Sequence, residues 1–179
     1  MTLRIFLFTM IMVFIVSGCS KQATTQTVQD QINYEVKYNV EIPKFQGFVM
    51  NFASIEYPPV GEKKRVRFGY TIEKDNLPEL TREEKELLRK GHKMNVLFGN
   101  PDSRNDFYIE VSNSETKIVN SEVTTISGEK VQTLADDKHA IFTINTGEGS
   151  YNLNVIFNDE INKQDSLNIA EQLVKQIVH

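Results

Sequence analysis

GEGSYNLNVIFNDEINKQDSLNIAEQLV, residues 147–174, contains a glycine turn, an alternating segment and a helical segment in direct succession. In the alternating segment, inward-facing side chains recur with the period of two that is typical of a half-buried strand, although Ile156 breaks the polar side formed by the asparagines: Tyr151, Leu153, Val155 and Phe157. Asn162 and Asp165 then form a capping pair. Apolar residues follow at three- and four-residue spacing: Leu167, Ala170, Leu173, Val174 and Ile177. We therefore expect a strand followed by a C-terminal helix that lies on the sheet.

Two other segments show the same alternation. NYEVKYNVEI (residues 33–42) places Tyr34, Val36, Tyr38, Val40 and Ile42 on one side, and RVRFGYTIE (residues 65–73) does so with Val66, Phe68, Tyr70 and Ile72. The segment 45–57 carries apolar residues at both parities, which indicates either a strand covered on both faces or a bulge near Ala53. Further strands are expected over residues 94–98, 106–111, 117–125, 130–134 and 138–145.

A shorter internal helix is expected in LTREEKELLRKG (residues 80–91). Thr81 and Glu84 form a capping box, and Gly91 ends the helix. Together these segments predict an α+β fold. We expect an antiparallel, twisted sheet with one solvent-exposed face, packed by the C-terminal helix and by the shorter internal helix.

The N-terminal eighteen residues have the layout of a secretory signal peptide. Arg4 precedes an apolar run from Ile5 to Val16, which is shorter than the roughly 20 residues that a spanning helix needs. Cys19, the only cysteine, follows directly. VSGC resembles the bacterial lipobox, in which a lipid is attached to the cysteine sulfur and the chain is cut just before it. We expect a diacylglycerol on Cys19 to hold the protein on the membrane; the alternative is a plain signal sequence that is discarded with its cysteine.

These observations predict the organisation and the location of the chain. We expect a lipoprotein signal peptide over residues 1–18, a lipidated N-terminus with a flexible tether over residues 19–31, and a single α+β domain over residues 32–179. The expected location is the extracytoplasmic face of the cell membrane. The formal net charge of −4 gives no basic excess, so no nucleic-acid partner is expected.

Residues suited to catalysis are few and scattered. The three histidines, His92, His139 and His179, show no metal-ligand spacing, and the paired carboxylates at residues 136–137 and 159–160 lie in turn-like segments. Glycine-rich phosphate loops and serine-nucleophile motifs do not occur in the sequence. We therefore expect no enzymatic activity, no metal site and no cofactor.

Two groups of residues are candidates for binding. Lys63, Arg65 and Arg67 would project from one strand face and contact anionic lipid headgroups; the alternative is a solvated hairpin end. A second group of aromatic side chains would line an apolar ligand cavity between sheet and helix, or would simply fill the core: Phe48, Phe52, Phe68, Tyr70 and Phe157.

Three stretches of the chain resemble an extracytoplasmic domain family of low-GC Gram-positive bacteria, found in small lipoproteins and at the C termini of anti-sigma and sporulation-related membrane proteins. They are VEIPKFQGFVMNFASIEY, VRFGYTI and the stretch quoted at the outset. The resemblance implies an α+β extracytoplasmic domain and carries no catalytic residues. We expect a non-enzymatic interaction module that meets an envelope protein or polymer. The alternative is a carrier or sensor of an apolar ligand.

Overall fold

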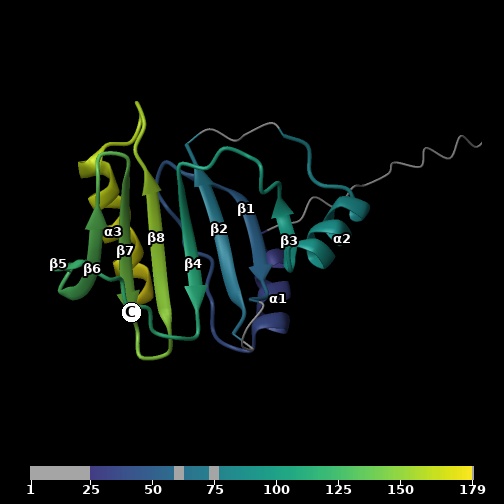
Figure 1. Cartoon of the computed structure of the whole chain (residues 1–179), viewed down its shortest axis with the longest axis horizontal. Helices are drawn as coiled ribbons and strands as arrows, with labels where there is room; N and C mark the ends of the chain where they lie inside the picture. The colour runs from purple at the N-terminus through teal and green to yellow at the C-terminus, as the bar shows by residue number, and fades with distance from the viewer. Residues whose placement is uncertain (1–24, 59–62, 73–76, 179) are drawn as a thin grey trace, which may run out of the picture.

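The computed structural model describes residues 25–58, 63–72 and 77–178. They form one eight-stranded antiparallel open sheet with three helices (Figure 1). The strands are β1 (Val49–Glu56), β2 (Arg65–Thr71), β3 (Met94–Gly99), β4 (Phe107–Ser112), β5 (Glu122–Ile126), β6 (Glu129–Ala135), β7 (His139–Asn145) and β8 (Ser150–Ile156). The helices are α1 (Thr25–Val36), α2 (Arg82–Gly91) and α3 (Lys163–Ile177). The predicted α+β class, with an antiparallel sheet and a C-terminal helix against it, is confirmed.

The strand order across the sheet is β3-β1-β2-β4-β8-β7-β6-β5. Short connections join β5 to β6, β6 to β7 and β7 to β8, whereas the segment 113–121 leads from the central strand β4 to the edge strand β5. Within this segment, the Thr116 backbone N–H donates to Asn145 Oδ1 at 3.0 Å, and its hydroxyl lies 2.8 Å from the Ser150 hydroxyl. The segment therefore lies against the ends of β7 and β8 as it passes.

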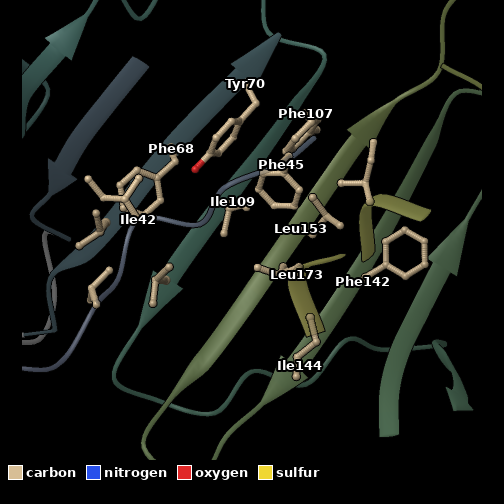
Figure 2. Close-up of a cluster of buried hydrophobic side chains, with 14 of the residues drawn as sticks. Ile42, Phe45, Phe68, Tyr70, Phe107, Ile109, Phe142, Ile144, Leu153 and Leu173 are labelled. Carbon is tan, nitrogen blue, oxygen red and sulfur yellow. The ribbon is translucent and has the colours of Figure 1, made fainter. Parts of the chain in front are cut away.

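The two faces of the sheet differ in what covers them. Helices α1 and α3 both lie behind the sheet in Figure 1, and we call this covered side the inner face and the opposite side the outer face. Buried side chains of β2, β4, β7 and β8 point to the inner face together with residues of the helices (Figure 2). At its centre the Tyr70 and Phe107 rings are stacked, with centroids 5.0 Å apart, and the Phe45 ring packs edge-on against both.

The strand predicted over Tyr34–Ile42 is wrong. The residues up to Val36 belong to α1, and residues 38–46, which we call the strap, cross the inner face without being a strand of the sheet. The alternation itself is real: Val40 and Ile42 are buried, whereas Asn39 and Glu41 are exposed. Extended backbone produces this pattern whether or not its hydrogen bonds go to a strand.

Glutamine side chains of both helices supply hydrogen bonds to the strap. From α1, Gln29 donates its Nε2 to the Val40 carbonyl at 2.5 Å and accepts from the Ile42 N–H at 3.0 Å. From α3, Gln176 accepts from the Lys44 N–H and donates to the Lys44 carbonyl, both at 2.8 Å. A glutamine amide carries both a donor and an acceptor, so it pairs with backbone as a neighbouring strand would. The strap therefore bridges the two helices.

Residues 25–31, predicted as part of a flexible tether, are helical. In α1, Val28, Ile32 and Val36 follow one another at four-residue spacing, and all three are buried against the inner face. Glu35 anchors the other side of the helix, because its carboxylate accepts from the Tyr57 hydroxyl and from Asn95 Nδ2. The apolar stripe explains the order of this segment despite its polar composition, and the packed domain begins before residue 32.

Strand β1 combines both interpretations left open for residues 45–57. Its register with β2 shifts between Met50 and Phe52, which places a bulge at Asn51, and its register with β3 shifts between Ala53 and Ser54, as expected near Ala53. After the bulge, Ala53 and Ile55 belong to the inner-face core. Phe52 points to the outer face and is nevertheless only 2% exposed. The strand is therefore both bulged and covered on both sides.

The helix stripes need one correction. In α3, the N-cap Asn162 and the capping box with Asp165 are present as expected, and Ala170, Leu173 and Val174 are buried. Leu167, predicted to face the sheet, is 37% exposed. Ile169, which the predicted stripe did not include, is buried instead. Helix α2 has its predicted capping box, but it buries no residue and lies beyond edge strand β3 (Figure 1).

Candidate functional site

A row of polar side chains runs across the outer face. Each member lies opposite the next in the strand register: Ser54, Arg67, Glu110, Asn152, Thr143 and Gln132, from β1, β2, β4, β8, β7 and β6. We call it the polar row. Within it, the Thr143 hydroxyl donates to Asn152 Oδ1 at 2.7 Å. Successive residues of a strand point to opposite faces, so the same strands that build the apolar core also build this polar surface.

Two members of the polar row, Arg67 and Glu110, form ion pairs with side chains of neighbouring strands. Arg65 Nη1 lies 3.0 Å from Glu110 Oε1, and Arg67 Nη1 lies 3.5 Å from Glu56 Oε1. The hydrogen bond to Glu110 raises the pKa of Arg65 above its usual value. The Arg67 guanidinium also lies 4.4 Å from the centroid of the Tyr108 ring. Both pairs are partly exposed, so they add little stability and instead fix where these side chains point.

Neighbouring segments cover the two ends of the polar row. At the β6 end, Gln132 accepts from the Ile118 N–H at 3.0 Å and donates to the Thr116 carbonyl at 2.9 Å. Near the β1 end, the Asn105 side chain lies directly over Gly69, where any Cβ would collide with it. Between these two ends, partly exposed or exposed side chains lie side by side on β2, β4 and β8. We call this group the open patch, and it consists of Arg65, Arg67, Tyr108, Glu110 and Asn154.

The predicted basic stripe falls partly within the open patch. Arg65 and Arg67 do share one face, as expected, while Lys63 is exposed just before β2. Each arginine is paired with a carboxylate from a neighbouring strand, which reduces the positive charge that it presents to an anionic surface. Contact of these three residues with lipid headgroups stays a prediction.

The five aromatic residues expected around an apolar cavity do not surround a common space. Phe68 and Tyr70 are buried on the inner face, and Phe48 packs edge-on against Phe107 with ring centroids 4.9 Å apart. Phe52 points to the opposite face of the sheet, and Phe157 packs at the margin of the core. The four surface clefts described in the structure are lined by other residues. Four of these rings therefore pack in or against the inner-face core, as in the alternative interpretation, whereas Phe52 is buried on the outer face.

The described histidines and the turn carboxylates lie at exposed positions. His92 is the exposed C-cap of α2, and His139 Nδ1 is 3.8 Å from Asp136 Oδ1 at an exposed turn. Asp136 accepts from the backbone N–H groups of Lys138 and His139, and these bonds hold its pKa below the usual value. His179 lies outside the described residues. In the described part of the chain, no three histidines, cysteines or carboxylates gather where they could hold a metal ion.

A buried carboxylate that the sequence analysis did not identify as structural ties the ends of β2 and β4 to the segment that follows β8. Asp106 is 1% exposed, and it accepts from the Thr71 hydroxyl at 3.0 Å, the Ile72 N–H at 2.9 Å and Asn158 Nδ2 at 3.0 Å. Arg104 lies 3.3 Å away and also pairs with Glu160. Because its oxygens are fully occupied by protein donors, Asp106 acts as an anchor between β2, β4 and the start of the α3 connection.

The chain was compared with family models, curated proteins and solved structures, and none of them matches it. Membership of the family that it resembles stays a prediction. The predicted signal peptide and Cys19 lie outside the described residues. None of the helices in the described residues has the length and apolar content to cross a bilayer.

Proposed function

We propose that this chain is a lipid-anchored module on the extracytoplasmic face of the membrane, and that its open patch contacts an envelope protein or polymer without chemistry of its own. The observation that carries the proposal is the open patch itself. It presents two arginines, a carboxylate, a tyrosine ring and an amide side by side on strands β2, β4 and β8 of the outer face. Arginine and tyrosine are enriched among residues that dominate binding energy at interfaces.

The arrangement of the open patch suits recognition better than catalysis. Its charges are neutralised in pairs and held by neighbouring strands, so the geometry is set before a partner arrives. The Tyr108 ring, held under the Arg67 guanidinium, offers a rigid surface to a sugar ring or to a peptide side chain. The signal-like N-terminus and the lone Cys19 support membrane attachment, which would bring this surface to the envelope.

Membrane attachment is tested by changing Cys19→Ala in the full chain. We expect the variant to lose incorporation of a fatty-acid analogue and to leave the membrane fraction or stay uncleaved. Equal incorporation by the variant and the natural chain would contradict lipidation at this residue.

The open patch is tested by placing a photoreactive amino acid at Asn154, with Leu87 on α2 as the matched control, since Leu87 is 70% exposed and lies away from the patch. Irradiated cells should yield a discrete cross-linked product from position 154 only. The product should weaken when Arg67→Ala and Tyr108→Ala are added. Identical products from both positions, or persistence in the double variant, would overturn the role of the patch.

A further inference from the structure

Two adjoining clefts lie on the inner face where the strap meets the end of α3. The first has a volume of about 370 Å³ and is lined in part by Tyr38, Tyr151 and Glu148. The second, of about 360 Å³, is lined in part by Glu41. Asn39, Tyr151 and Ile177 line both clefts. Each cleft is within the size range of small-molecule sites.

The charged groups that line these clefts are all acidic. Glu148 lines the first cleft and Glu41 the second, and no lysine or arginine lines either. Among the described residues, neither glutamate has an ion-pair partner within 4.0 Å. The C-terminal end of α3, at Ile177, adds the partial negative charge of a helix terminus. The two clefts therefore favour a positively charged ligand.

The tyrosines add neutral aromatic walls. The Tyr38 hydroxyl contacts the carbonyls of Lys64 and Val111 at 3.0 and 3.1 Å, and burial raises the pKa of Tyr38 to about 12. Burial also raises the pKa of Tyr151, and the Glu41 and Glu148 carboxylates raise it further. Both rings stay uncharged at neutral pH. An organic cation gains attraction from such ring faces in addition to the carboxylates.

We propose that the two clefts together bind a linear aliphatic diamine or polyamine, with one ammonium beside Glu148 and another beside Glu41. Tyr151 lines both clefts, so a chain of methylene groups that passes this ring would bring one ammonium to Glu148 and the other to Glu41. This site lies on the inner face and shares no residue with the open patch. A failure of one proposal would therefore leave the other unaffected.

The arrangement fits an amine better than a bare metal ion. Each cleft offers a single carboxylate, whereas Ca²⁺ requires about 6–8 oxygen ligands around one point. Glu41 and Glu148 are both exposed at the cleft rims, so an ammonium can reach them without the domain opening. Exposure also means that replacing either carboxylate by an amide should leave the fold intact.

The proposal is tested by calorimetric titration of the full chain, in a neutral detergent, with spermidine as the probe. We expect saturable binding of one spermidine per chain, weakened about tenfold by each of Glu41→Gln and Glu148→Gln. Glu122→Gln on edge strand β5 is the matched control and should leave the affinity unchanged, because Glu122 is exposed and lines neither cleft. Butylamine, with one ammonium, should bind more weakly than spermidine.

Three results would overturn the proposal. Absence of saturable spermidine binding at millimolar concentration would show that the two clefts do not bind a polyamine. An equal loss of affinity in Glu122→Gln would show that binding is a general effect of surface charge. Butylamine binding as tight as that of spermidine would exclude the arrangement with one ammonium in each cleft.

Discussion

Helices α1 and α3 cover the same face of the sheet, yet their sequences specify them in different ways. Helix α3 begins with a capping box and ends with Lys175 in its last turn, so local signals mark both of its ends. Helix α1 has no acidic residue in its first turn and no basic residue in its last. Its place is set by three buried aliphatic residues at four-residue spacing and by Glu35. Tertiary packing can thus define a helix that local signals leave unmarked.

The largest expected effect tests whether α1 is as integral to the core as α3. Ile32 and Leu173 are both fully buried, so Ile32→Ala and Leu173→Ala should each lower the free energy of unfolding by about 2–5 kcal/mol in urea melts. Tyr34→Ala, at a residue 88% exposed, and Leu167→Ala serve as controls and should change it far less. An unchanged midpoint for Ile32→Ala would show that α1 is the loose segment suggested by its composition.

A smaller effect is expected at the start of α3. The Asn162 side chain accepts from the backbone N–H groups of Gln164 and Asp165, at 2.7 and 3.2 Å. Asn162→Ala should therefore lower the free energy of unfolding by about 0.5–2 kcal/mol and speed amide exchange in the first turn. The neighbouring Lys163→Ala is the control. If exchange in the first turn does not change, the capping box does not hold this end of the helix.

The contribution of each helix to the strap is expected to be similar. Gln29→Ala and Gln176→Ala should each lower the free energy of unfolding by about 0.5–1.5 kcal/mol per hydrogen bond lost. Amide exchange should accelerate at Ile42 in the first variant and at Lys44 in the second, because those N–H groups lose their acceptors. Gln26→Ala and Gln164→Ala are controls on the exposed surfaces of the same helices. Acceleration at both amides in either variant would instead indicate that the strap is released as one unit.

The smallest expected effect is the response of the strap to alkaline pH. Burial raises the pKa of Tyr38 to about 12, whereas an unfolded tyrosine titrates near 10. The protonated hydroxyl therefore contributes stability that is complete below about pH 10 and is lost as the pH rises toward 12. Tyr38→Phe should be less stable at neutral pH but should lose less stability between pH 10 and 12. Parallel curves for the two proteins would assign the alkaline loss to other groups, such as Tyr57.

Several elements were predictable because a single segment carries the whole signal. Strands β2 and β8 alternate cleanly, and α2 and α3 have caps that depend only on residues three apart. The alternation in residues 33–42 led to a wrong strand prediction, because the end of α1 is followed directly by the extended strap. The apolar residues of both segments fall on even-numbered positions, so the two segments look like one strand. The signal that indicates α1 is the spacing of Val28, Ile32 and Val36, which overlaps this alternation.

The candidate surfaces were less predictable because they depend on strand neighbours. The shared face of Arg65 and Arg67 follows from the sequence, but their partners Glu110 and Glu56 are set by the register of β4 and β1. Phe48 and Phe52 have the same parity, and the bulge at Asn51 sends them to opposite faces. The acidic clefts combine the strap, a hairpin and the end of α3, so no single segment indicates them.

If Cys19 is acylated as we propose, the start of α1 at Thr25 limits the distance between this domain and the bilayer. Thr25 follows Cys19 by six positions, and six residues span at most about 20 Å even when fully extended. With Cys19 acylated as we propose, this connection is too short for the domain to reach layers of the envelope far from the membrane. Any partner of the open patch would then be found close to the lipid surface, within about one domain diameter of the headgroups.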